Sequence, residues 1–327
     1  MSIIKLLLLL AMASLASAQP IQVYAHRGAR AFCPENTLPA YAATLKIGAD
    51  WLDMDVVLTR DNQVLVSHDP VLNPDIVRDE HGHFLAANRD ALNQSSPEQR
   101  ADYTRRYAAR NLTLEELQRF DVGRLNPDSS YARYFPDQIP VDGTRMPTLL
   151  EVIHFARKSS NPLIGLQIEM KTAPEHPEFS ADPKDFAAAL YKILRDEQVI
   201  DRAEIQSFDF RCLEALQTLD RRVKTCYLTS REEEAATPGV ALPRKVKQLG
   251  GFAWEPEDAQ LTRETLEEAH RLGLKVVVWS WPEKLGTAFD AKLAARMIDW
   301  RVDGIITDDP GRLISMLAAR GMAVPAR

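Results

Sequence analysis

Residues 275–280 read Lys-Val-Val-Val-Trp-Ser, and this short stretch carries most of the information about the fold. Three consecutive valines leave no polar side chain for solvent, so a strand made of them is buried on both faces. Such strands are typical of parallel sheets that are covered by helices. A helix that stops at Gly273 is predicted before the stretch, at 262–272, and another is predicted after it, at 287–299.

The same alternation of strand and helix extends along most of the chain. Strands are predicted at 23–25, 51–58, 163–170, 204–207, 223–228, 251–254, 275–280 and 304–307, and helices at 36–47, 149–158, 183–197, 210–218, 238–249, 262–272, 287–299 and 312–319. No Gly-x-Gly-x-x-Gly follows the first strand, which argues against a dinucleotide-binding sheet. Eight strand–helix units in 327 residues predict one α/β domain, a closed TIM (β/α)8 barrel.

The alternation lapses between residues 70 and 146, after a strand-like extension at 63–67. This region is polar and rich in Asp, Asn, Arg and Pro. One helix is predicted in it, at 113–120, because Thr113 and Glu116 have the spacing of a capping box. We therefore predict a mostly irregular insertion at 70–146, after the second strand of the barrel.

The first 18 residues have the pattern of a signal peptide. Lys5 precedes an apolar run that is too short to span a membrane, and Ala16-Ser17-Ala18 resembles a cleavage site. We expect the single barrel domain at 19–327 to be exported without a stable membrane anchor. The periplasm is the first expectation for its location, and secretion is the alternative.

The bulk composition describes a globular protein with a formal net charge of −6. Nucleic acid is not an expected partner, because its binding depends on clustered Lys and Arg, and no basic face is seen. The odd count of 3 cysteines leaves at least one unpaired, and none has the spacing of zinc ligands. Composition leaves the oligomeric state open.

Polar and aromatic residues gather where the predicted strands end, which is where TIM barrels place their active sites. These residues are His26, Arg27, Asp53, Asp55, Glu169, Lys171, Ser207, Phe208, Trp254, Glu255, Trp279, Trp281, Thr307 and Asp308, and His68 follows the strand-like extension. Each residue taken alone has an ordinary structural explanation, such as a salt bridge or a packed aromatic ring. Their joint occurrence at strand ends predicts one shared site, in which Trp279 is assigned to substrate binding.

The residue types at these ends fit the metal-assisted cleavage of a phosphodiester. Carboxylates suit a hard cation such as Ca²⁺ or Mg²⁺. The cations Arg27 and Lys171 can offset charge on phosphoryl oxygens. Of the two histidines, one can remove a proton from the attacking hydroxyl or water, and the other can protonate the leaving alcohol.

Several motifs, in order along nearly the whole predicted mature chain, resemble those of the glycerophosphodiester phosphodiesterase family. They are His26-Arg27-Gly28, Pro34-Glu35-Asn36-Thr37, Gly48-Ala49-Asp50, Asp53-Met54-Asp55, Thr59-Arg60-Asp61, His68-Asp69, Glu169-Met170-Lys171, Ser207-Phe208-Asp209 and residues 303–310. The long insertion is similar to that of the periplasmic branch of the family.

This resemblance implies a TIM barrel with one divalent cation, often Ca²⁺, with Mg²⁺ as the alternative. It places the metal ligands on Asp53, Asp55 and Glu169, the acid/base pair on His26 and His68, and the phosphate-binding cations on Arg27 and Lys171. The chain departs from the family pattern at Asp53, where Glu is usual. The shorter side chain is expected to change metal distance, affinity or preference.

The predicted activity is hydrolysis of a small-molecule glycerophosphodiester to sn-glycerol 3-phosphate and an alcohol. A phospholipase D-like activity on lysophospholipids is one alternative, and it would require an apolar, membrane-facing rim. A non-catalytic exported phosphodiester-binding protein is another, and it is disfavoured because both histidines are present. Head-group preference and the identity of the acid among the two histidines stay open at this point.

Overall fold

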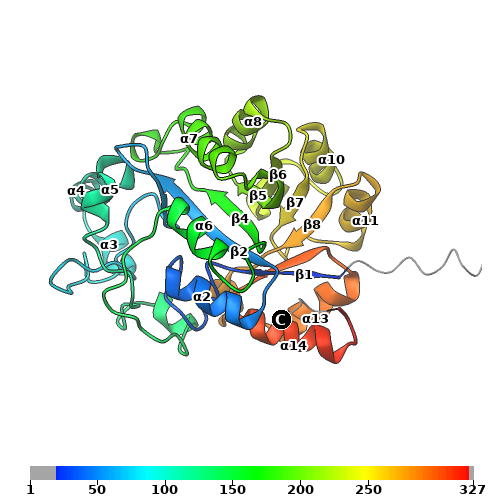
Figure 1. Cartoon of the computed structure of the whole chain (residues 1–327), viewed down its shortest axis with the longest axis horizontal. Helices are drawn as coiled ribbons and strands as arrows, with labels where there is room; N and C mark the ends of the chain where they lie inside the picture. Colours follow the sequence, from blue (N-terminus) through cyan, green and yellow to red (C-terminus); the bar gives the residue numbers. More distant parts are fainter. Residues whose placement is uncertain (1–19, 324–327) are drawn as a thin grey trace, which may run out of the picture.

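The computed structural model describes residues 20–323, without the side chains of 232–234. The predicted signal peptide at 1–18 lies outside the described residues. The eight parallel strands, in the order β1-β9-β8-β7-β6-β5-β4-β2, close on themselves because β1 also pairs with β2. Helices surround the strands (Figure 1), and the predicted TIM barrel is confirmed.

The strands of the barrel are close to the predicted ranges. They are β1 (Gln22–Ala25), β2 (Trp51–Leu58), β4 (Gly165–Met170), β5 (Ala203–Ser207), β6 (Lys224–Thr229), β7 (Ala253–Pro256), β8 (Lys275–Val278) and β9 (Gly304–Thr307). β3 (Val64–Val66) is the predicted extension at 63–67, and it pairs antiparallel with the end of β2. The valines at 276–278 are buried, as expected for a strand covered on both faces.

The helices around the barrel are α2 (Leu38–Ile47), α6 (Leu149–Arg157), α7 (Pro183–Asp196), α8 (Phe210–Leu219), α9 (Arg231–Ala236), α10 (Ala241–Gln248), α11 (Arg263–Arg271), α12 (Pro282–Leu285), α13 (Ala291–Trp300) and α14 (Pro310–Ala319). The predicted helix at 287–299 begins later, at α13, because the Asp290 carboxylate accepts from the N–H groups of Lys292 and Leu293 and caps it there. None of the helices within 20–323 is long and apolar enough to cross a membrane.

Alternation along the strands separates the hydrophobic core from the site. In β2, Leu52 and Met54 belong to the apolar cluster between strands and helices, whereas Asp53 and Asp55 occur at the intervening positions. The three cysteines are free thiols, and two of them, Cys212 and Cys226, are buried. Packing of apolar side chains therefore leaves the polar positions of the strands for the site.

The insertion contains more helix than its sequence predicts. The predicted capping box is confirmed at α5 (Leu114–Leu117), where Thr113 and Glu116 make both bonds. The sequence analysis missed α3 (Arg89–Gln94) and α4 (Pro97–Tyr107). Tyr103 is the one buried residue of α4, so the helix lacks the periodic apolar face by which a helix is recognised.

A small hydrophobic cluster attaches the insertion to the barrel. Its buried members are Val57, Leu65, Leu72, Val77, Ala109, Leu117, Val122 and Met146. Val57 lies on β2 and Leu65 on β3, so the insertion packs directly against the strands that precede His68. Figure 1 shows α3, α4 and α5 together beside the far end of β2. The insertion is thus fixed next to the C-terminal end of the barrel.

Close packing at the start of β4 gives a first prediction. A Cβ at Gly165 would lie 2.3 Å from Trp51 Cε3, and the Trp51 indole is held by Tyr24 stacking and by a bond to Gln22 Oε1. Overpacking of this kind costs about 1–3 kcal/mol, so Gly165→Ala should lower the thermal midpoint by several degrees. Gly311→Ala is the control, because its nearest neighbour is 3.6 Å away. Equal thermal midpoints for the two variants would contradict the prediction.

Candidate active site

A pocket with a volume of about 100 Å³ lies at the C-terminal ends of the strands. Seven of the eight predicted site residues line it: His26, Arg27, Asp53, His68, Glu169, Lys171 and Trp279. The eighth, Asp55, is buried and contacts Arg27 and Lys171. The structure therefore brings together the eight residues that had an assigned role. Of the other residues expected at the shared site, Phe208 and Trp281 line the pocket, whereas Ser207, Trp254, Glu255 and Thr307 do not.

His26 directly follows β1 and begins a tight turn. Arg27, Gly28 and Ala29 all have positive φ, and a Cβ at Gly28 would lie 2.7 Å from the Cβ of Ala40 on α2. The imidazole Nδ1 lies 2.8 Å from Asp308 Oδ1 at the end of β9. Burial and the nearby Arg30 guanidinium lower the pKa of His26 to about 4, so the ring is neutral at pH 7.

His68 follows β3 and has the same kind of environment. Its Nδ1 lies 3.1 Å from Asp69 Oδ1, and the other oxygen of Asp69 accepts from Arg89 Nη2 at 2.6 Å. Burial and the positive charges of Arg27 and Lys171 lower the pKa of His68 to about 4. Both histidine side chains are 20% exposed, so each reaches the pocket while one nitrogen stays on a carboxylate.

The lowered pKa of His68 predicts a pH dependence of folding stability. The folded state binds this proton only near pH 4, and the unfolded chain binds it near 6.5. The contribution to stability is therefore fully present above pH 6.5 and is lost as pH falls toward 4. Between pH 7.5 and 4.5, wild type should lose more thermal stability than His68→Gln does. Parallel curves of thermal midpoint against pH would contradict the lowered pKa.

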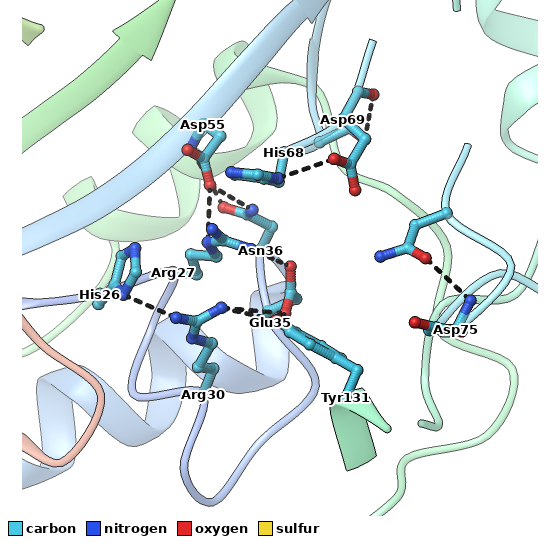
Figure 2. Close-up of polar contacts among 12 residues, drawn as sticks. His26, Arg27, Arg30, Glu35, Asn36, Asp55, His68, Asp69, Asp75 and Tyr131 are labelled. Atoms are coloured by element: carbon cyan, nitrogen blue, oxygen red, sulfur yellow. Dashed lines mark hydrogen bonds and ion pairs between the residues drawn. The ribbon is translucent and has the colours of Figure 1, made fainter. Parts of the chain in front are cut away.

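Two cations lie among the carboxylates of the site. Arg27 donates to Glu35 at 2.8 Å and lies 3.4 Å from Asp55 Oδ2. Figure 2 shows the Arg27 guanidinium between the two histidine rings. Lys171 Nζ lies 2.7 Å from Glu169 Oε1 and 3.6 Å from Asp55 Oδ1. Both cations face the carboxylates and line the pocket, where they can meet a phosphoryl group.

Asp53, Asp55 and Glu169 form a nearly buried set of carboxylates, with exposed fractions of 3%, 3% and 7%. Asp55 and Glu169 are partners in the register between β2 and β4. Burial and the charges of the other two raise the pKa of Asp53, and burial raises that of Glu169 to about 7. Burial alone would raise the pKa of Asp55 too, but the Arg27 guanidinium holds it well below its usual range.

This carboxylate set has the donor chemistry for a hard divalent cation, because all of its potential ligands are oxygens. Within the described residues, however, no group of three or more His, Cys, Asp or Glu side chains is arranged around a common ion position. The Lys171 ammonium lies between Asp55 and Glu169. The oxygen ligands of these residues thus suit a divalent cation. In this structure the Lys171 ammonium supplies the positive charge beside them.

Aromatic rings form another wall of the pocket. Trp279, at the end of β8, packs edge-on against Phe208 and Trp281, with ring centroids 5.4 and 5.0 Å away. Its indole N–H donates to the Glu255 carbonyl at 3.0 Å, which fixes the ring. This wall offers apolar surface to a bound molecule, opposite in character to the charged residues of the site.

Sequence reasoning missed several residues that hold the site together. Asp69, Glu35 and Asn36 occur only inside the motifs quoted above, and Asp308 was expected at the shared site without its role as the partner of His26. The Asn36 side-chain N–H donates to Asp55 Oδ2 at 2.8 Å, and its Oδ1 accepts from the Tyr41 hydroxyl at 3.1 Å. Arg89 and Tyr131 belong to the insertion, and no pattern in the sequence marks them as pocket residues.

The barrel and the groups at its strand ends define a hydrolase of phosphoric diesters. The chain belongs to the glycerophosphoryl diester phosphodiesterase family, whose sequence profile matches residues 26–312. The predicted family and enzyme class are thereby confirmed.

Individual relatives agree with this assignment. A protein of Bacillus subtilis assigned as a glycerophosphodiester phosphodiesterase is 27% identical over 294 residues, which are 89% of this chain and 96% of that protein. A solved structure from Silicibacter pomeroyi, assigned as a glycerophosphoryl diester phosphodiesterase, has a TM-score of 0.80 and 30% identity, and covers 93% of this chain and 95% of its own.

A third relative was solved with a bound product. The phosphodiesterase from Oleispira antarctica, in complex with sn-glycerol-3-phosphate, is 20% identical to this chain with a TM-score of 0.65. The match covers 91% of this chain and 97% of that one. At this identity the likeness shows the shared fold.

Proposed function

We propose that this protein is a metal-dependent glycerophosphodiester phosphodiesterase that releases sn-glycerol 3-phosphate and an alcohol by two-histidine acid/base catalysis. The observation that carries the proposal is the placement of His26 and His68 in one pocket with Arg27 and Lys171. Family membership and the product in the Oleispira antarctica structure support the choice of substrate class.

Each histidine is prepared for proton transfer by the carboxylate on its Nδ1. An aspartate at Nδ1 favours the tautomer with the proton on that nitrogen, and the Nε2 lone pair is then free to act. At His26 this preference is opposed by the Arg30 guanidinium, whose Nη2 lies 3.2 Å from Nδ1 and can only donate, so the preference is stronger at His68. Because both rings are neutral at pH 7, either can accept a proton from the attacking hydroxyl or water. The other takes a proton from solvent, is stabilised as an imidazolium by its aspartate, and passes that proton to the leaving alcohol, while the base returns its own proton to solvent after product release.

The cations of the site orient the phosphodiester and offset its charge. Arg27 is anchored by Glu35, so its guanidinium is preorganised before substrate arrives. Lys171 is held by Glu169 and reaches the same pocket. The aromatic wall around Trp279 contacts the carbon atoms of the bound molecule and keeps water from that side.

Asp53, Asp55 and Glu169 are proposed to hold one divalent cation, Ca²⁺ in the first place and Mg²⁺ as the alternative. When bound, the ion would polarise a phosphoryl oxygen. We further propose that the protein is exported and cleaved after Ala18, to the periplasm or the medium. Mass spectrometry of the active protein would find Gln19 at its N-terminus, and a retained leader would contradict export by this route.

The substrate class is tested by comparing glycerophosphocholine with lysophosphatidylcholine, each with and without Ca²⁺ or Mg²⁺. We expect choline release from the first at least about tenfold faster, because none of the large apolar residues that are exposed in the described part of the chain lines the pocket: Ile139, Val141, Leu150, Leu163 and Leu219. Preference for the lysophospholipid would favour the phospholipase D-like alternative. Tight binding of glycerophosphocholine without turnover would favour a binding protein.

A further inference from the structure

The two histidines are held by two matching chains of side chains. His26 leads to Asp308 and then to Arg30, whose Nε lies 2.6 Å from Asp308 Oδ1. His68 leads to Asp69 and then to Arg89, whose Nη2 lies 2.6 Å from Asp69 Oδ2. Each chain therefore contains an imidazole, a carboxylate and a guanidinium, and in the first chain Arg30 Nη2 also lies 3.2 Å from the His26 Nδ1 itself.

Both chains end on the insertion. Arg89 is the first residue of α3, and its backbone N–H donates to Asp75 Oδ1 at 2.7 Å. Asp75 also belongs to the insertion, so the insertion fixes the backbone from which the Arg89 side chain extends. Arg30 belongs to the barrel, but its Nη1 donates to the hydroxyl of Tyr131 at 2.6 Å, in η2 (Tyr131–Tyr134). Tyr131 in turn donates to Glu35, the anchor of Arg27.

The insertion also encloses Arg30. The Phe135 ring centroid lies 4.7 Å from the guanidinium carbon, and the Gln138 side-chain amide donates to the Arg30 carbonyl at 2.8 Å. Arg30 is only 2% exposed as a result. A buried guanidinium that is held on several sides has little freedom, and the carboxylate bonded to it is fixed in turn.

We propose that the insertion is a positioning element for the catalytic pair, which fixes His68 through Asp69 and Arg89 and fixes His26 through Asp308, Arg30 and Tyr131. Figure 2 shows the Tyr131 side chain of the insertion beside Arg30 and Glu35, and His68 beside Asp69. Arg89 and Tyr131 are the positioning residues. The inference rests on the proposed function, because it assigns their effect to the histidines that carry the chemistry.

The kinetic test is Arg89→Ala against the matched control Arg124→Ala. Arg124 is also in the insertion, has the same 42% side-chain exposure, and forms an ion pair with Asp142 away from the pocket. By analogy with the outer partners of metal-bound histidines, Arg89→Ala should lower kcat for glycerophosphocholine roughly 10–100-fold. KM should stay within about threefold, added guanidinium should restore part of kcat, and Arg124→Ala should resemble wild type.

Tyr131→Phe tests the second chain, with Tyr103→Phe as its control. Each change removes one buried hydroxyl of the insertion, and Tyr103 donates to the Leu72 carbonyl instead of to the site. Tyr131→Phe should reduce kcat more than Tyr103→Phe does at equal thermal stability. Equal kcat in the two variants would overturn this arm of the proposal.

A readout that does not depend on turnover is NMR of protein labelled with ¹⁵N-histidine. Arg89→Ala should shift the ring nitrogens of His68 and leave those of His26 in place, and Tyr131→Phe should do the reverse. Unmoved rings together with wild-type kcat would overturn the proposal, as would a raised KM at constant kcat. Absence of turnover in wild type would instead contradict the proposed function, and the ring signals would still decide the positioning role.

Discussion

His26→Ala and His68→Ala should each lower kcat for glycerophosphocholine by roughly 10²–10⁴-fold, because a positioned general acid or base contributes that much. Both residues line the pocket, and each has its Nδ1 on a carboxylate. The double variant should be scarcely slower than the poorer single one, since residues that act as a unit are not additive. Steady-state kinetics on samples of known thermal midpoint measures the effect per folded molecule.

His270→Ala is the matched control for these variants. His270 also pairs with an aspartate, Asp303 at 2.8 Å, but it lies on α11 outside the pocket. Its loss should leave kcat near the wild-type value. A His68→Ala protein with near-normal kcat would show that His68 merely packs beside Asp69, and it would remove the acid/base pair from the account.

Removing divalent metal should abolish activity, which is the second large effect we expect. Asp53, Asp55 and Glu169 are nearly buried, and burial first, with the negative charge of neighbouring carboxylates after it, raises the pKa values of Asp53 and Glu169. A bound cation would relieve this repulsion. Excess chelator should therefore stop turnover, and Ca²⁺ or Mg²⁺ should restore it, whereas chelator presaturated with Ca²⁺ should have no effect.

Asp53→Glu separates a ligand role from a structural one. The Asp53 carboxylate accepts from Gln206 at 2.8 Å, and the longer side chain would carry its oxygens about one methylene further into the pocket. If Asp53 binds the ion, the midpoint of the Ca²⁺ or Mg²⁺ titration should move by more than the folding stability changes. Full activity in excess chelator, or identical titration curves, would contradict the metal assignment.

The barrel could be predicted because its signals are local. Apolar runs such as residues 276–278, and stops such as Gly48 and Gly273, mark strands and helix ends without knowledge of their neighbours. Boundaries that depend on a cap chosen among several polar residues were less certain, as at Asp290. α3 and α4 could not be predicted because α3 has no buried residue and Tyr103 is the one buried residue of α4, so neither helix has a periodic apolar face.

The site could also be predicted in part. His26, Asp53, Asp55 and Glu169 could be grouped because parallel strands end at one edge of a barrel. The partners of Arg30 could not be found in this way, since Tyr131 is 101 residues away in sequence and comes from the insertion. The position of Lys171 between two carboxylates also depends on how neighbouring strands pair, which no local pattern records.

The most direct test of the central claim is ³¹P NMR of purified mature protein with glycerophosphocholine and Ca²⁺ or Mg²⁺. The account predicts that the phosphodiester signal is replaced by that of sn-glycerol 3-phosphate, with choline released in equal amount, and that His68→Ala slows this conversion at least about 100-fold. Phosphocholine as the product, no conversion by the metal-replete protein, or unchanged conversion by His68→Ala would contradict it.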